Sequence, residues 1–298
     1  MNPDNQTQPV PIPVDQPIIE DVGKSTNEYI KAHYKKFIFL YIFVSVAIVA
    51  TLVYFGSGAA FAAVLILLIL GATLYASVQD RIVSQFIQQF GASIGFSYAK
   101  SVGIDTVAGR LFQVGHGQTI TNVLSGTREG KPERIFSYCF AVGSGKNECS
   151  YSCTVFEHSL DGSVPDILLF SSKIESQPYG WLAVDEMMER GNGSKDEIVR
   201  LEGDFNKYFR LAVPKGFEME AYQIFTPDVM AKLIDLACDF SFELSGNKLY
   251  IFATRVIGKR EDFDAIFALS AYVSSLFQKN TERMKVITQA DLVANSGN

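Results

Sequence analysis

The first candidate for a chemical function is a glycine-rich loop, Gly143-Ser-Gly-Lys146. A phosphate-binding P-loop requires the pattern G-x-x-x-x-G-K-[ST], whose last hydroxyl binds magnesium. Here Phe140 stands at the first glycine position and Asn147 at the hydroxyl position. The segment that follows alternates like a strand, so no helix N-terminus would face a phosphate. The loop therefore predicts a hairpin turn and not a nucleotide site.

Histidine is the usual base near neutral pH, and His116 lies between Gly115 and Gly117. A mobile loop could present it to a substrate, but a lone histidine between glycines is also typical of a turn. His158 falls within a predicted strand and His33 beside an apolar segment. Neither has a partner that the sequence identifies, so His116 alone is kept as a candidate, beside the turn interpretation.

The four cysteines are Cys139, Cys149, Cys153 and Cys238. They are too few for a disulfide framework in 298 residues. If Val142 pairs with Glu148, the first three project from one face of a hairpin. Cys149 and Cys153 would then lie roughly 13 Å apart along a strand, whereas one zinc holds thiolates at about 2.3 Å. The spacing predicts structural thiols and no metal site.

Two neighbouring carboxylates, Glu202 and Asp204, could work as an acid and a base if their environments differed. In the alternative interpretation, Gly203 makes a turn and Asp204 caps a short helix over Asp204–Phe209. The turn and cap are preferred. No residue is assigned a catalytic, cofactor-binding or metal-binding role, and no cofactor is expected.

The distribution of charge excludes one class of partner. The net charge is −6 and the pI about 5.2, whereas phosphate contacts in a nucleic-acid binder need a basic face or run. The one dense basic cluster, Lys31, Lys35 and Lys36, directly precedes an apolar segment. Nucleic acid is therefore not an expected partner.

The strongest signal is a stretch without any Asp, Glu, Lys or Arg, from Phe37 to Gln79. It divides at Gly56-Ser-Gly58 into Phe37–Phe55 and Ala59–Ser77. Each half, as a helix, reaches roughly 28 Å, close to the ~30 Å hydrocarbon core of a bilayer. The sequence predicts a transmembrane helical hairpin, with the lipid bilayer as a partner.

Basic residues flank this hairpin on one side only. Lys35 and Lys36 precede it, Arg81 follows it, and the turn around Ser57 carries no charge. Positive residues stay on the cytoplasmic side. We therefore expect both termini in the cytoplasm and Ser57 outside.

The predicted fold class is α+β, a two-helix transmembrane hairpin followed by a mainly antiparallel domain. The expected organisation is a disordered tail at 1–23, a juxtamembrane helix at 24–36, the hairpin at 37–77, a connector at 78–102, a cytoplasmic domain at 103–290 and a polar tail at 291–298. Ser25 is expected to cap the juxtamembrane helix, with Glu28 completing a capping box.

Within the domain, Arg134–Val142 and Glu148–Leu160 read as a hairpin, because alternate residues are apolar. Further strands are predicted at Asp166–Ser171, Arg200–Glu202, Arg210–Val213 and Glu218–Phe225, with a last hairpin of Phe240–Leu244 and Lys248–Thr254. A second capping-box pattern stands at Ser194–Glu197, and helices are predicted from Thr226-Pro227 and at Glu261–Asn280.

Leu201-Glu-Gly-Asp-Phe205 and a Tyr-x-x-Phe-Thr-Pro-Asp-x-Met block at Tyr222–Met230 resemble motifs of a group of bacterial membrane proteins of unknown function. Gly143–Lys146 and Ile167–Leu169 are also similar to the middle region of that group. The resemblance covers most of the chain after Gly91. It implies a bacterial inner-membrane protein with a cytoplasmic domain, and it implies no activity.

Two functions from different classes remain open. The first is a membrane-tethered interaction or sensing module whose partner is another protein or a second copy of this chain. The second is a membrane-bound enzyme whose site is assembled from scattered residues, with Glu202, Asp204 and His116 as its candidates. A polar cluster with shifted pKa values in a cleft would favour the enzyme.

Overall fold

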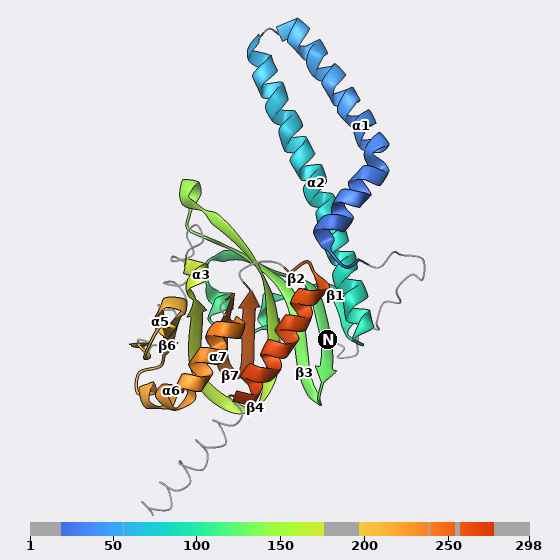
Figure 1. The fold of residues 1–298 in the computed structure, drawn as a ribbon. Coiled ribbons are helices and arrows are strands. Elements are labelled where there is room, and N and C mark those ends of the chain that lie inside the picture. The colour runs from blue at the N-terminus through green and yellow to red at the C-terminus, as the bar shows by residue number, and fades with distance from the viewer. Residues whose placement is uncertain (1–18, 56, 176–196, 238, 254–256, 277–298) are drawn as a thin grey trace, which may run out of the picture. The chain divides into compact units, whose positions relative to one another are not determined.

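The structure, a computed structural model, describes residues 19–55, 57–175, 197–237, 239–253 and 257–276 (Figure 1). Backbone contacts divide these residues into two compact units. The first holds the residues up to Ser93 together with Gly258–Arg260, and the second holds the remainder. Residues 1–18 of the tail predicted at 1–23, the tail predicted at 291–298 and the predicted capping box at Ser194 lie outside the described residues.

The first unit consists mainly of two long helices, α1 (Val22–Phe55) and α2 (Ser57–Ser93). Both apolar segments predicted from the sequence are thus helical. The predicted cap at Ser25 is wrong, because α1 starts earlier and Asp21 caps it. The Asp21 carboxylate accepts a hydrogen bond from the N–H of Lys24 at 3.0 Å, satisfying one of the free donors of the first turn.

Residues Gly258–Arg260 return to the start of α1. The Val22 N–H donates to the Gly258 carbonyl at 2.9 Å, and Lys259 Nζ lies 3.6 Å from the Asp21 carboxylate. The Lys24 N–H, and after it the charge of Lys259, hold the pKa of Asp21 below its ordinary value. The first turn of α1 is therefore held in place by Gly258 and Lys259, which are far from it in the sequence.

The two helices expose large apolar side chains along their middle parts. The exposed residues include Phe39, Ile42, Phe43, Val46, Val49, Leu65, Ile66, Leu68, Ile69 and Tyr75. No helical stretch of the described residues combines the length and the hydropathy that crossing a membrane requires.

Among its described residues, the second unit forms one antiparallel sheet of seven strands. They are β1 (Ser97–Val102), β2 (His116–Arg128), β3 (Lys131–Val142), β4 (Cys149–Ser171), β5 (Glu197–Val199), β6 (Phe209–Val213) and β7 (Phe240–Ala253). Their order is β1-β2-β3-β4-β6-β5, and β7 also pairs with β4. The α+β class predicted from the sequence is confirmed, although the sheet already begins at Ser97.

Strand β4 organises the sheet because it is long enough to serve three partners. Its first part pairs with β3, its last part pairs with β6, and β7 pairs along both parts. Between Ser159 and Ile167 its register against β7 shifts, so the extra residues bulge out of the ladder. The predicted strand Asp166–Ser171 is therefore the end of β4 and not a separate strand.

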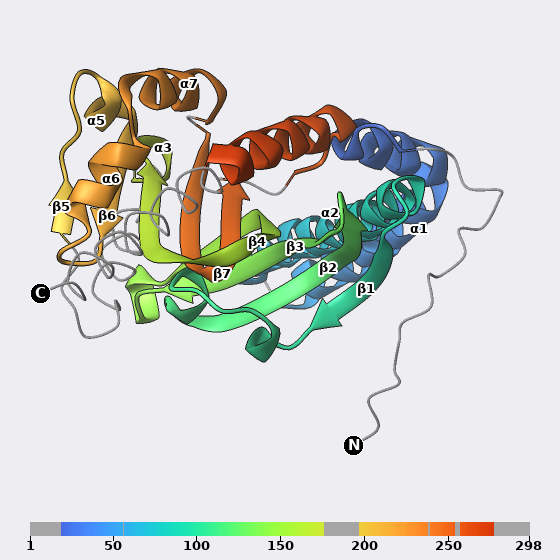
Figure 2. The ribbon, with the colours of Figure 1, turned by 90° about the horizontal axis from the view of Figure 1, so that it is seen from below.

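Both faces of the sheet are covered. The helices of this unit are α3 (Ser172–Glu175), α5 (Phe205–Tyr208), α6 (Glu218–Ile224), α7 (Pro227–Ala237) and a helical segment at 261–276. Figure 2 shows α7 and the last helical segment on one face, where Phe267 meets Phe156 edge to face at 5.6 Å. On the other face, Phe112 packs against Phe136, Tyr138 and Tyr250.

Two predicted elements take another conformation. Glu218–Phe225 contains the helix α6 and is not a strand, since its buried residues Ala221, Ile224 and Phe225 repeat at helical spacing. Arg200–Glu202 is not a strand either, because β5 ends one residue earlier.

The predicted hairpin of Phe240–Leu244 and Lys248–Thr254 is also wrong. Residues 240–253 form the single strand β7, which continues through Gly246. Gly246 has φ +59°, a conformation that glycine adopts without strain. It lies opposite the bulge of β4, so the irregular partner accommodates a bend and the chain does not reverse.

Candidate functional site

The loop Gly143–Asn147 joins β3 to β4, as the sequence predicts. Residues Gly145–Asn147 form one short 3-10 turn, and Lys146 is exposed. The chain after the turn enters a strand, so the backbone donors that hold a phosphate in a P-loop are not provided by a following helix. The loop has the geometry of a hairpin turn.

We expect Lys146→Ala to change the free energy of unfolding by less than about 0.5 kcal/mol, because an exposed turn lysine contributes little. Denaturant unfolding of the full chain in neutral detergent measures this change. Magnesium-dependent nucleotide hydrolysis that disappears in Lys146→Ala would contradict the hairpin interpretation.

His116 lies at the start of β2, beside this turn. Its Nε2 is 3.2 Å from the Gly143 carbonyl oxygen and 4.0 Å from the Glu148 carboxylate. Both side chains are about half exposed, at 54% and 47%. The flanking Gly115 and Gly117 both have φ +65°, so they shape the turn that places His116. The contacts are those of a turn residue.

The cysteines do not share one face, because the hairpin register differs by one residue from the predicted one. Val142 pairs with Cys149, not with Glu148, and Cys139 lies opposite Ser152. A one-residue shift sends a side chain to the other face of a sheet. The Cys139 sulfur lies 3.1 Å from the Ser152 hydroxyl, whereas Cys153 is buried.

Burial raises the pKa of the Cys153 thiol to about 12, so Cys153 stays protonated at neutral pH and is a poor metal ligand. No group of three or more His, Cys, Asp or Glu side chains in the described part of the chain could hold a metal ion. Cys238 lies outside the described residues.

Glu202 and Asp204 do not form an acid–base pair in a cleft, since both are exposed around a turn. Gly203 has φ +67°, which confirms the turn. Asp204 stands at the N-cap position of α5 but makes no capping hydrogen bond with its side chain. It pairs instead with Lys207 at 2.7 Å.

A buried carboxylate–imidazole pair, which no sequence motif indicated, lies between β3 and β4. Glu133 Oε1 lies 2.9 Å from His158 Nδ1, and both residues are buried. Such a pair can orient a catalytic base. Here His158 Nε2 is itself inaccessible and has no hydrogen-bond partner among the described residues. It cannot reach a substrate, so the pair is a structural feature of this face.

A second buried carboxylate, that of Glu157, lies on the opposite face of the sheet. It accepts from Arg134 Nε at 3.0 Å and pairs with Lys248 Nζ at 2.9 Å. Arg134 also donates to the Thr106 carbonyl at 2.8 Å. The Ala108 N–H donates to the Tyr250 hydroxyl at 3.2 Å. These bonds fasten the loop of residues 103–115, named the covering loop here, onto the sheet.

The covering loop also makes buried hydrogen bonds with Glu243. The two carboxylate oxygens of Glu243 accept the N–H groups of Arg110 and Leu111, the latter at 3.1 Å. Burial raises the pKa of Glu243 to about 7, although the two N–H donors oppose the shift. A Cβ at position 109 would lie 3.1 Å from both carboxylate oxygens and would press on them, and the φ of +150° at Gly109 also favours glycine.

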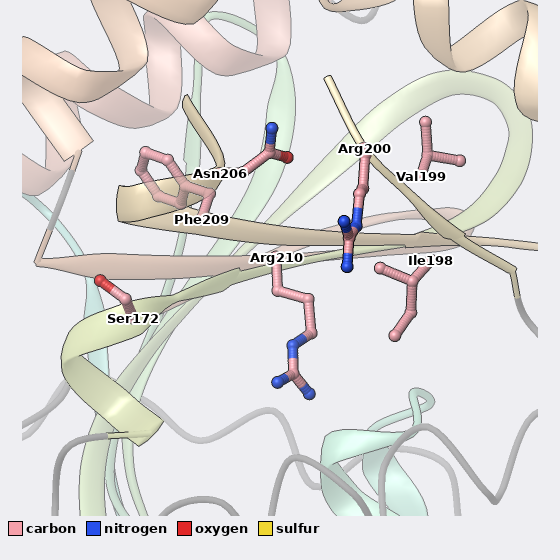
Figure 3. A pocket seen from close by; sticks show the side chains of 7 residues that line it. All are labelled: Ser172, Ile198, Val199, Arg200, Asn206, Phe209 and Arg210. Atoms are coloured by element: carbon pink, nitrogen blue, oxygen red, sulfur yellow. The ribbon is translucent and has the colours of Figure 1, made fainter. Parts of the chain in front are cut away.

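A cavity of about 460 Å³ opens at the other end of the sheet (Figure 3). It is lined by Ser172, Ile198, Val199, Arg200, Asn206, Phe209 and Arg210. Two guanidinium groups therefore face a cavity whose described lining contains no acidic residue. Of these two arginines, only Arg200 is close in sequence to a candidate catalytic residue, Glu202. From the sequence, Arg200 was expected to begin a strand.

The motifs that carry the family resemblance are structural. Leu201 and Phe205 are buried, and Phe205 stacks on Phe209 with ring centroids 5.0 Å apart. Pro227 opens α7, as predicted. The resemblance thus rests largely on core, turn and helix-start residues.

Neither a protein-family model nor a curated protein sequence matches this chain. Among solved structures, the chain is similar to the crystal structure of the mycobacterial trehalose monomycolate transport factor A, TtfA. The two are 12% identical, with a TM-score of 0.46, and the similarity covers 66% of this chain and 93% of that one. At this level the likeness carries no conclusion about the function of this chain.

Proposed function

We propose that this chain is a membrane-anchored binding module, in which α1 and α2 insert into the inner membrane and the sheet domain binds a partner in the cytoplasm. The observation that carries the proposal is the row of large apolar side chains exposed on both helices. Phe39 and Phe43 are 76% and 74% exposed on α1, and Leu68 is 66% exposed on α2. Contiguous apolar surface of this kind marks a membrane or protein contact.

The sequence around these residues supports lipid as the contact. No charged residue interrupts the chain between Phe37 and Gln79, and a bilayer core excludes charged groups.

A binding role is preferred to catalysis because the three candidate catalytic residues do not meet. His116 contacts the hairpin turn, Asp204 pairs with Lys207, and Glu202 is exposed. The carboxyl group with the raised pKa, that of Glu243, is enclosed in the core and fastens the covering loop. No observation on the described residues favours the enzyme.

The topology gives a direct test of the anchor. With the four native cysteines replaced by alanine, Ser57→Cys is expected to react with a membrane-impermeant maleimide on intact spheroplasts, because the positive flanks keep both ends inside. The matched variant, Lys215→Cys, lies in an exposed loop after β6. It should react only after the membrane is permeabilised. Labelling of Lys215→Cys on intact spheroplasts, or protection of Ser57→Cys, would refute the proposed orientation.

A further inference from the structure

Both helices of the first unit continue beyond the charge-free stretch Phe37–Gln79. Helix α1 begins at Val22, well before the stretch, and α2 ends at Ser93, well after it (Figure 1). Each residue of an α-helix advances the chain by about 1.5 Å along the axis. The axial distance of a charged residue from the stretch therefore follows from its distance in the sequence.

Basic residues are concentrated at the two ends of this stretch. Within six residues of it on either helix, the basic residues are Lys36, Lys35, Arg81 and Lys31, at roughly 1.5, 3, 3 and 9 Å along the axis. These four residues are named the basic belt here. Asp80 is the one acidic residue in the same ranges, 31–36 and 80–85, so four positive charges and one negative charge leave a net charge of +3. The whole chain, in contrast, carries −6.

The lysines of α1 follow one face of the helix. Lys24, Lys31 and Lys35 are separated by seven and four residues, which places them within about 40° of one another around the axis. Val22 and Thr26 are buried on the opposite face, whereas Lys24 and Lys31 are exposed. The exposed face of α1 therefore carries positive charge up to the start of the charge-free stretch.

Two lengths decide which of these charges act on a membrane surface when the hairpin is inserted up to the ends of the stretch. Each polar head-group layer of a bilayer is roughly 5–8 Å thick. Beyond it, salt screens a charge over a Debye length of about 8 Å at physiological ionic strength. The basic belt falls within the sum of these lengths. Lys24 lies outside it, roughly 20 Å from Phe37. Glu28, at roughly 14 Å, lies at its limit with the opposite charge.

We propose that the basic belt binds the head groups of anionic phospholipids at the surface of the membrane that holds α1 and α2. The amine of a zwitterionic head group offsets its phosphate, so only an anionic lipid brings a net charge that the belt can neutralise. Basic residues next to a membrane helix attract such lipids through a field that falls off within a Debye length. The inference rests on the membrane anchor proposed above and names the class of lipid that it selects.

The test uses the full chain in phosphatidylcholine vesicles that contain phosphatidylglycerol, with a spin label on one lipid or the other. The immobilised fraction of each labelled lipid gives its association with the protein. We expect the wild type to prefer phosphatidylglycerol. Lys35→Gln/Lys36→Gln should lower this preference at least about 5-fold, the factor for one basic residue at an anionic surface. Lys35→Arg/Lys36→Arg keeps both charges and should keep the preference. In 1 M salt the wild type should lose most of it, because the Debye length falls to about 3 Å.

Lys24→Gln is the matched control, since it removes the same charge from the same face of α1 outside the range of the surface. It should keep the wild-type preference. Equal association of both lipids with the wild type, a preference that persists in 1 M salt, or an equal loss in Lys24→Gln and Lys35→Gln/Lys36→Gln would overturn the inference and leave the belt for an acidic protein. Carbonate extraction of the vesicles tests the anchor separately. A chain that carbonate removes would overturn the anchor, and this inference with it.

Discussion

Gly115→Ala is expected to destabilise the sheet domain by about 4 kcal/mol or more, the range reached by a steric conflict that the structure cannot relax. A Cβ at this position would overlap the backbone carbonyl of Ala141, and a backbone group cannot turn aside as a side chain can. Gly115 also has φ +65°, which adds the strain of a left-handed conformation.

Gly117→Ala is the matched control. It has the same φ of +65°, but nothing lies within 4 Å of the Cβ that it would gain. We expect it to cost about 1 kcal/mol, from backbone strain alone. Denaturant unfolding of both variants in neutral detergent compares the two losses. Equal losses would show that the backbone conflict at Gly115 is relieved by movement of β3.

This pair of variants also separates the two interpretations of the Gly-His-Gly motif. If the glycines served to make His116 mobile, both positions would tolerate alanine about equally. The close approach of the chain to Ala141 at Gly115 indicates instead that the motif seats β2 against β3.

Local patterns in the sequence predicted those elements whose partners lie nearby. The hairpin of β3 and β4 was visible in the alternation around Gly143–Asn147, and α7 in its proline start. The register was not visible, because both faces of β3 are largely buried and a shift by one residue leaves the apolar pattern acceptable. Without the register, the face of the sheet on which Cys139 lies could not be predicted either.

Elements that depend on distant partners were misread. The segment Phe240–Ala253 has turn residues at its centre, and only the bulge of β4 explains why it continues as a strand. Arg200 and Arg210 are close in sequence but line the same cavity only because α5 returns the chain between them. A local sequence pattern carries no information about either of these contacts between distant segments.

The same limit applied to Glu243, which the sequence placed in an ordinary strand. Its partners Arg110 and Leu111 lie more than a hundred residues away, and their N–H groups are invisible to residue type. A buried acid whose partners are backbone donors can be recognised only once the covering loop is seen on the sheet. It is also the group from which the domain should derive its clearest response to pH.

Stability of the sheet domain is expected to fall as the pH rises from about 5 to about 8, through Glu243. Burial raises the pKa of this carboxyl from its ordinary 4.5 to about 7 in the folded chain. Between these values the folded state holds a proton that the unfolded state has released. The stabilisation is therefore complete below the unfolded pKa and is lost as the pH passes the folded pKa, by an amount on the order of 3 kcal/mol.

Glu243→Gln removes the titrating group and nearly preserves the side-chain shape, so its unfolding free energy should lose this dependence on pH. At pH 5 it should be less stable than the wild type by about 1–3 kcal/mol, because an amide offers one acceptor oxygen to the two N–H groups. Glu202→Gln, at an exposed glutamate, serves as the control and should keep the wild-type slope. Denaturant unfolding at pH 5 and pH 8 measures all three proteins. A slope that persists in Glu243→Gln would assign the pH response to another group and leave Glu243 as a purely geometric fastening of the covering loop.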